Sequence, residues 1–339
     1  MTEIKTNLYL IIFLPFCFIQ CSYHGNAYKD NSNTALTKYE LVQDWPRLPK
    51  GFNLSDVTAV GIDRDQNIFL FQRTGRHWTQ PFPDTTISSN TIFLLDNVTG
   101  KILNSWGANL FIMPHGLTVD NENNVWVTDV ALQQIFKFSH DGKLLMNLGV
   151  AKISGNDSMH FNLPTDVAIA TDGSFYVSDG YGNSRVVKFS KEGKYLFDWG
   201  KKGDKAGEFN TPHGIDLDSK DNVYVADREN NRIQKFNSKG QFLKEWKNNT
   251  ATQLYSLSID KKNDLFAIDN LTINDTLIKG ADIIHFDSRL NILIRFGRSD
   301  SDGVSVPRYH DIDIDNNGNI YVAETLGRRI RKFRKNSTK

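Results

Sequence analysis

Apolar and polar residues alternate in short segments along most of the chain, and turns rich in Asp, Asn and Gly separate these segments. Alternation with a period of two is typical of β-strands that bury one face. One stretch, which begins at Pro212, contains an alternating segment, then apolar segments at Val223–Ala226, Arg232–Phe236 and Phe242–Trp246. We therefore expect four strands joined by tight turns within this stretch.

The same order of segments repeats along the chain. Its copies, four strong and two weak, begin at Pro114, Pro164, Pro212 and Tyr309, and at Val57 and Tyr255. Four strands in every roughly 40–55 residues are typical of the blades of a β-propeller. Six copies therefore predict an all-β fold, a six-bladed β-propeller in a single domain at residues 39–335.

The last copy is one strand short, because the chain stops soon after its third strand at Arg329–Phe333. Tyr39–Trp45, near the other end of the chain, has the pattern of a fourth strand. We expect it to complete the last blade and close the ring, since closure pairs strand edges that would otherwise stay open.

The N-terminal segment before the repeats has a different character. An apolar run at Leu8–Gln20 has the length of a secretory signal rather than of a membrane span. We expect a signal peptide at residues 1–21 and a polar, flexible tether at 22–38. Cys21-Ser22 resembles a lipoprotein cleavage site, so the protein is expected to be exported, either secreted or held at the cell envelope through a lipid on Cys21. N-x-S/T sequons occur, and they would matter for a glycoprotein made in a eukaryotic host.

Charge and cysteine content limit the expected partner classes and cross-links. Lys plus Arg number 40 and Asp plus Glu 39, a formal net charge of +1, which argues against nucleic acid or an acidic membrane surface as the main partner. Both cysteines, Cys17 and Cys21, lie in the N-terminal segment, so no disulfide is expected in the domain. No coiled-coil segment is present, and we expect a monomer.

Three histidines occupy one position of the repeat. The six residues at that position, in blade order, are Thr58, His115, Thr165, His213, Tyr255 and His310. Alternate blades of a sixfold ring stand about 120° apart, so the three imidazoles can converge on the axis. Three neutral imidazoles with a fourth position open are typical of a catalytic zinc site. The alternative is that duplication copied histidines that merely pack.

Arg73, Tyr181 and Arg228 follow second strands of their blades, and such loops open on the same face as the histidines. A phenol and two guanidiniums beside a divalent ion suit proton abstraction and anion binding. The alternative is that these are solvated loop residues. Three further arginines, Arg185, Arg232 and Arg329, fit a bracing role between loops better.

Several of these stretches resemble one family. Met113–Leu117, Pro164–Val167, Val177–Arg185 and Val225–Ile233 are similar to peptidyl-α-hydroxyglycine α-amidating lyase, a member of the NHL-repeat β-propellers. The likeness runs from about Val57 to Phe333. It implies a zinc ion on His115, His213 and His310, and a structural calcium ion on the carbonyls of Val60 and Leu117 and the carboxylate of Asp311.

The resemblance also implies roles and a reaction. Tyr181 would be the general base, and Arg73 and Arg228 would orient the substrate and activate the tyrosine. The reaction would cleave a peptidyl-α-hydroxyglycine, or a similar small N-acyl-α-hydroxyglycine, to an amide plus glyoxylate. Two other readings stay open: a non-catalytic NHL propeller that binds a protein or glycan, and a metal-dependent lactonase or esterase.

Two departures from the family's pattern stand out. Its paired cysteines are replaced here, by Gly182, Tyr224, Lys235 and a residue near Asn162. Its Met-Pro-His-Asp motif reads Arg308-Tyr309-His-Asp in this chain. Arg308 and Tyr309 thus replace residues that the resemblance places next to the metal, which brings the substrate preference into question.

Overall fold

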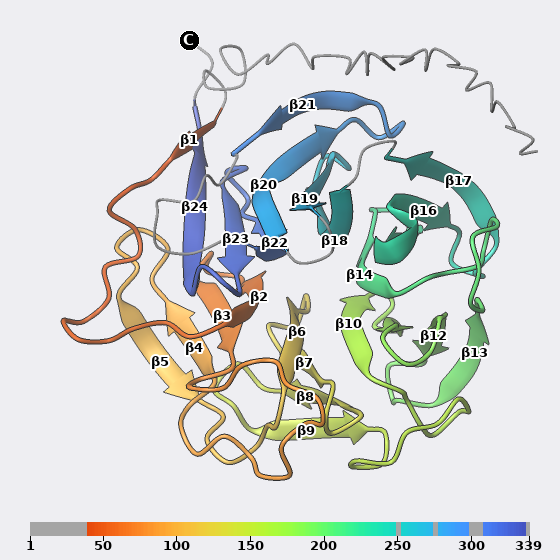
Figure 1. The fold of residues 1–339 in the computed structure, drawn as a ribbon, viewed down its shortest axis with the longest axis horizontal. Helices are drawn as coiled ribbons and strands as arrows, with labels where there is room; N and C mark the ends of the chain where they lie inside the picture. The colour runs from red at the N-terminus through yellow and green to blue at the C-terminus, as the bar shows by residue number, and fades with distance from the viewer. Residues whose placement is uncertain (1–38, 249–251, 274–276, 298–307, 337–339) are drawn as a thin grey trace, which may run out of the picture. The chain divides into compact units, whose positions relative to one another are not determined.

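The computed structural model describes residues 39–248, 252–273, 277–297 and 308–336. In this part of the chain, six four-stranded antiparallel sheets stand as blades around a central axis (Figure 1). The expected six-bladed β-propeller is therefore confirmed. The signal peptide and tether expected at residues 1–38 lie outside the described residues. No helix among the described residues is long and apolar enough to cross a membrane.

The innermost strand of each blade borders the axis (Figure 1). These strands are β2 (Val57–Ile62), β6 (Pro114–Val119), β10 (Pro164–Ile169), β14 (Pro212–Leu217), β18 (Thr252–Ile259) and β22 (Tyr309–Ile314). Each one contacts the innermost strands of the two neighbouring blades, so they form a closed inner wall. The repeat position that carries the histidines lies near the start of these strands.

The remaining strands lie progressively farther from the axis. The second strands are β3 (Ile68–Gln72), β7 (Val125–Asp129), β11 (Phe175–Asp179), β15 (Val223–Asp227), β19 (Leu265–Ile273) and β23 (Ile320–Glu324). The third strands are β4 (Ile92–Leu95), β8 (Gln134–Phe138), β12 (Arg185–Phe189), β16 (Arg232–Phe236), β20 (Leu277–Phe286) and β24 (Arg329–Lys335). The outer strands are β5 (Ile102–Trp106), β9 (Leu144–Leu148), β13 (Tyr195–Trp199), β17 (Phe242–Lys247), β21 (Ile292–Phe296) and β1 (Tyr39–Leu41).

The ring closes through the N-terminal strand, as expected. β1 pairs antiparallel with β24, with Tyr39 opposite Lys335 and Leu41 opposite Phe333. The observed strand is three residues long, shorter than the expected Tyr39–Trp45. The last blade thus joins both ends of the chain, which fixes the position of the strand that carries His310.

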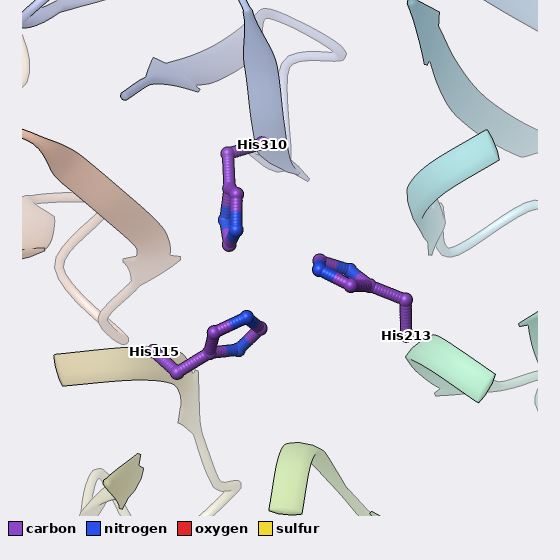
Figure 2. A group of neighbouring side chains, drawn as sticks. All are labelled: His115, His213 and His310. Atoms are coloured by element: carbon purple, nitrogen blue, oxygen red, sulfur yellow. The ribbon is translucent and has the colours of Figure 1, made fainter. Parts of the chain in front are cut away.

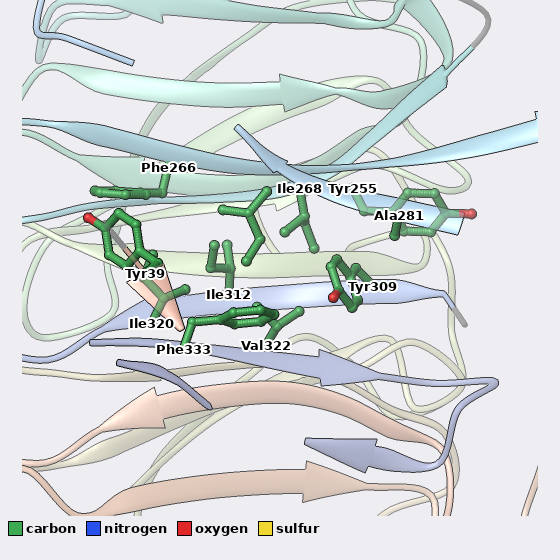
Figure 3. Close-up of a cluster of buried hydrophobic side chains, with 11 residues drawn as sticks. Tyr39, Tyr255, Phe266, Ile268, Ala281, Tyr309, Ile312, Ile320, Val322 and Phe333 are labelled. Atoms are coloured by element: carbon green, nitrogen blue, oxygen red, sulfur yellow. The ribbon is translucent and has the colours of Figure 1, made fainter. Parts of the chain in front are cut away.

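Apolar side chains fill the spaces between neighbouring blades. Figure 3 shows one such cluster, in which Tyr39, Phe266, Ile312, Ile320 and Phe333 come from blades five and six. The Tyr39 ring stacks on Phe296 with 4.6 Å between ring centroids. Strand alternation explains these clusters, because the residues that point away from one sheet face meet those of the next blade. The blades are therefore held in a fixed rotation about the axis.

Candidate metal centre and active site

A β-bulge interrupts each innermost strand at the histidine position. The ladder with the second strand slips between Val57 and Ala59, Pro114 and Leu117, Pro164 and Asp166, Pro212 and Gly214, Leu254 and Ser256, and Tyr309 and Asp311. A bulged residue is left out of the ladder, and its side chain is re-aimed. The three histidines and the intervening Thr58, Thr165 and Tyr255 are all bulged residues.

The three imidazoles converge on the axis (Figure 2), and backbone carbonyls hold them. Nδ1 lies 2.7 Å from the Thr165 oxygen in His115, 2.7 Å from the Tyr255 oxygen in His213 and 2.6 Å from the Thr58 oxygen in His310. Because a carbonyl only accepts hydrogen bonds, each Nδ1 carries the proton and each Nε2 keeps a lone pair. Each histidine is therefore oriented by the bulged residue of the next blade.

The three histidines fit a metal ion. All are buried, and one ring nitrogen from each lies within 4.8 Å of the others. Burial lowers the pKa of His115 to about 3, with Arg73 contributing, and burial also lowers the pKa of His213 and His310 well below the usual range. The imidazoles are thus neutral, as metal binding requires. Three buried lone pairs that converge are a poor arrangement without a cation, so the site can hold a metal.

Tyr181 reaches this centre from the loop that follows β11. Its hydroxyl lies 2.9 Å from Nε2 of His213 and 3.1 Å from Nε2 of His115. Only glycine fits before it, since a Cβ at Gly180 would lie 1.9 Å from the carbonyl oxygen of Pro212. Burial raises the pKa of the Tyr181 phenol, while Arg228 and Arg73 oppose the rise. The phenol is therefore protonated at neutral pH when no cation is bound.

Arg228 lies against the same phenol. It begins the 3-10 helix η1 (Arg228–Asn230), and its Nη1 donates to the Tyr181 hydroxyl at 3.3 Å. The guanidinium also pairs with Glu229 at 2.8 Å and lies over the Tyr255 ring, 5.0 Å from its centroid. A cation in this place stabilises the phenolate form of Tyr181 relative to the phenol.

Arg73 follows β3 on the same face. It is buried, and its Nε donates to the Pro114 carbonyl at 3.1 Å. The guanidinium lies 5.1 Å from the ring centroid of Trp78, and this ring lies 5.1 Å from that of Tyr181. Our reading of the sequence missed Trp78. The signal was present, because the connection between β3 and β4 is much longer than the other turns and carries aromatic residues.

One of the expected calcium ligands, Asp311, lines the same cavity as the histidines. The carboxylate of Asp311 accepts hydrogen bonds from the Val60 amide at 2.9 Å and the Ser256 hydroxyl at 2.7 Å. Leu117 packs against the neighbouring strand, where a Cβ at Gly61 would lie 2.5 Å from its Cδ2. Burial raises the pKa of Asp311 to about 7. The structure therefore brings Val60 and Asp311 together, and calcium binding stays a prediction.

A second carboxylate, Asp166, lines the same cavity as Asp311 and the histidines. Burial and the charge of Asp311 raise its pKa well above the usual range. Two oxygen ligands that repel each other suit a hard cation, which would relieve the repulsion. Asp166 had no place in the expected ligand set.

Arg308 and Tyr309, which depart from the family's motif, lie in different surroundings. The Tyr309 ring is buried in the apolar cluster of Figure 3, and its hydroxyl donates to the Gly297 carbonyl at 2.6 Å. The expectation that Tyr309 stands next to the metal site is therefore wrong, because the strand pleat turns it outward. Arg308 lies over the Tyr255 ring, 5.9 Å from its centroid, and its charge lowers the pKa of His310 after the larger effects of burial, His115 and Arg73.

Two of the three expected bracing arginines, Arg185 and Arg232, contact the loops that enter their blades, and Arg329 pairs with Glu324 at 2.8 Å. Arg185 pairs with the buried Asp179 at 3.0 Å and donates to the carbonyls of Asp157 and His160. Arg232 pairs with Asp227 at 2.8 Å in the same way. Each pair ties the end of a second strand to the loop that enters the blade, and so supports the loops that carry Tyr181 and Arg228.

Fold and site together define a six-bladed β-propeller of NHL repeats with a buried three-histidine centre that can bind a metal. The NHL repeat model matches residues 111–138, 161–189 and 209–236. Among solved structures, a streptogramin B lyase covers 89% of this chain with 99% of its own, at a TM-score of 0.57 and 15% identity, which supports the fold alone.

The chain is homologous to peptidyl-α-hydroxyglycine α-amidating lyases. The Drosophila melanogaster peptidyl-alpha-hydroxyglycine alpha-amidating lyase 1 is 34% identical over 343 residues, covering 89% of this chain and 62% of the relative. The Xenopus laevis peptidyl-glycine alpha-amidating monooxygenase B is 33% identical over 319 residues, covering 86% of this chain and 35% of the relative. The resemblance drawn from the sequence is thereby confirmed, and the chain spans less than two thirds of the length of either relative.

Proposed function

We propose that this protein is a metal-dependent lyase that cleaves a peptidyl-α-hydroxyglycine, or a similar N-acyl-α-hydroxyglycine, to an amide plus glyoxylate. One observation carries the proposal: the Tyr181 hydroxyl lies within 3.1 Å of Nε2 in both His115 and His213, and Arg228 donates to it. A buried phenol placed between metal-binding nitrogens and a guanidinium is suited to proton transfer.

The reaction transfers one proton from the substrate hydroxyl to the leaving nitrogen. The phenolate of Tyr181 removes the proton from the substrate hydroxyl, the oxygen forms the aldehyde of glyoxylate, and the carbon–nitrogen bond breaks. The amide nitrogen leaves with the bonding electrons and takes a proton, which the Tyr181 phenol returns. No water is consumed, so the role of the enclosed site is to orient the hydroxyl and limit competing proton transfer.

The metal and the arginines complete the site. His115, His213 and His310 would hold zinc, which as a Lewis acid lowers the pKa of oxygen ligands and polarises the substrate oxygen. Arg228 offsets the cost of a buried phenolate. Arg73 is fixed by the Pro114 carbonyl, so its remaining donors are available for the substrate carboxylate.

The proposal includes two further parts. We assign a structural calcium ion to Asp311 with the carbonyls of Val60 and Leu117, supported by the raised pKa values of two adjacent carboxylates. We also propose that the protein is exported, on the strength of the apolar N-terminal run and Cys21. A non-catalytic propeller that only binds a protein or glycan would not need Tyr181 between the imidazoles.

The test is glyoxylate release from a small N-acyl-α-hydroxyglycine, with the protein zinc-loaded, chelated, and as His213→Ala. His140→Ala is the matched control, because His140 lies in a turn and pairs with Asp63 away from the axis. We expect release that requires both zinc and His213 and survives in the control. Folded, zinc-loaded protein that releases no glyoxylate contradicts the proposal, and folded protein that binds no zinc favours the binding propeller.

A further inference from the structure

Arg308, at the site, departs from the residue types at the corresponding positions of the repeat. Arg308 stands two residues before His310, where the corresponding residues in blades two and four are Met113 and Thr211. A copy of either of these two histidine blades would carry an uncharged residue there. The structure places Arg308 beside Tyr255, with 5.9 Å between the guanidinium carbon and the ring centroid.

Arg308 differs from the other two arginines in its charge balance. Arg228 pairs with Glu229 at 2.8 Å, and the charges of Asp56 and Asp129 act on Arg73. Within the described residues, Arg308 has no ion pair, and its Nε is buried without a hydrogen-bond partner. A buried guanidinium nitrogen without an acceptor is costly, so a partner from outside the chain is expected.

The surroundings of Arg308 favour an anion. A metal ion bound by the three histidines would add positive charge near the guanidinium. Tyr255 stands next to Arg308, and its hydroxyl makes no hydrogen bond in the part of the chain that the structure describes. A phenol donor beside a guanidinium fork fits a carboxylate, which accepts from both.

We propose that Arg308 and Tyr255 form a second anion subsite, which selects α-hydroxyglycine substrates whose preceding residue is acidic. The inference rests on the proposed function, in which the substrate's own carboxylate goes to Arg73. Arg73 is fixed on blade one by the Pro114 carbonyl, whereas the Arg308–Tyr255 subsite lies on blades five and six. The carboxylate and the preceding residue lie on opposite sides of the bond that breaks, so one can meet Arg73 on blade one while the other meets Arg308 on the neighbouring blade six.

The experiment compares two substrates that differ only in charge, N-acetyl-glutamyl-α-hydroxyglycine and N-acetyl-glutaminyl-α-hydroxyglycine. We expect the full chain, zinc-loaded, to prefer the glutamyl substrate by about tenfold or more in kcat/KM, the size of a charge-assisted hydrogen bond. In Arg308→Met, which installs the residue of blade two, the ratio falls to about one. Arg308→Lys keeps part of the preference because it keeps the charge.

Arg289→Met is the matched control, since Arg289 is exposed in a turn between β20 and β21. It should leave the substrate ratio at the wild-type value. A wild-type ratio near one, or a ratio that Arg308→Met does not change, overturns the subsite. Equal loss with both substrates in Arg308→Met also overturns it, because Arg308 would then share the common carboxylate with Arg73.

A binding measurement separates this inference from the proposed function. Calorimetric titration with N-acetylglutamate and N-acetylglutamine needs no turnover. We expect wild type to bind the dicarboxylate more tightly by about tenfold, and Arg308→Met to lose that difference. If neither substrate yields glyoxylate, the proposed function fails, while this preference still supports the anion subsite and its absence overturns it.

Discussion

Zinc binding should release few protons, because burial already keeps the three imidazoles neutral. The perturbation is a change of pH to 6, where ordinary histidines are mostly protonated. With an ordinary pKa near 6.5, each imidazole carries about 0.76 of a proton at pH 6, so three would release about 2.3 protons when a metal binds. With the pKa of His115 at about 3 and those of His213 and His310 also lowered, we expect the imidazoles to release almost none.

The assay is calorimetric titration of zinc into metal-free protein at pH 6, in buffers that differ in ionisation enthalpy. The dependence of the observed heat on the buffer gives the number of protons released per ion. The raised pKa values of Asp311 and Asp166, and the protonated phenol of Tyr181, make these three groups further sources of protons. The titration is therefore also made in the variant Asp166→Asn, Asp311→Asn, Tyr181→Phe, which lacks them. We expect this variant to release fewer than one proton per ion, and a count of two or more refutes the reasoning that burial and the carbonyl contacts hold the imidazoles neutral.

Three substitutions test other parts of the structure. Tyr181→Phe removes the hydroxyl between the imidazoles and should lower kcat for glyoxylate release at least about a hundredfold, while metal analysis still finds one zinc; release above a tenth of wild type contradicts its role as base. Gly214→Ala brings a Cβ to 2.8 Å from Ser256 Cα and 3.1 Å from the Tyr255 carbonyl oxygen, so zinc affinity measured by chelator competition should fall about tenfold. Tyr39→Ala removes a buried ring from the closing strand and should lower the free energy of unfolding in denaturant by about 3 kcal/mol, whereas a loss under 1 kcal/mol means that closure adds little.

The fold was predictable because one pattern of strands repeats along the chain. Six copies of one strand pattern determine the number of blades without knowledge of any contact, and the incomplete last copy identifies the closing strand. The boundary of that strand was less predictable. Pairing ends after Leu41, although the alternating pattern continues to Trp45 and β24 continues to Arg329, because the chain enters a turn at Gln43 and Asp44.

Residues of the site differ in how far the repeat reveals them. Histidine at one repeat position in alternate blades is visible in the sequence, and the structure brings all three together. Trp78 belongs to a long connection without a counterpart in other blades, so no repeat position marks it. Tyr309 was misplaced because sequence proximity to His310 does not tell which face of the strand a side chain takes when a bulge intervenes.

The positions replaced relative to the family's cysteines show a similar limit. The structure brings them together in two pairs: a Cβ at Gly182 would lie 2.1 Å from the Asn162 side chain, and Tyr224 is opposite Lys235 in the β15–β16 ladder. The ammonium of Lys235 lies 4.6 Å from the Tyr224 ring centroid, so a cation–π contact joins the second pair. The sequence showed that the cysteines were absent, and only the structure shows what stands in their place.

The bulges explain how three of the six blades each place a histidine at the axis. A bulge takes a residue out of the ladder and can leave its carbonyl free, and the freed carbonyls of Thr58, Thr165 and Tyr255 each hold Nδ1 of a histidine from the preceding blade. Each ligand therefore uses two blades, one for the imidazole and one for the carbonyl that orients it. If every blade carried a histidine, six imidazoles would crowd the axis, so alternation provides both the threefold symmetry and the orientation that a tetrahedral ion with one open position requires.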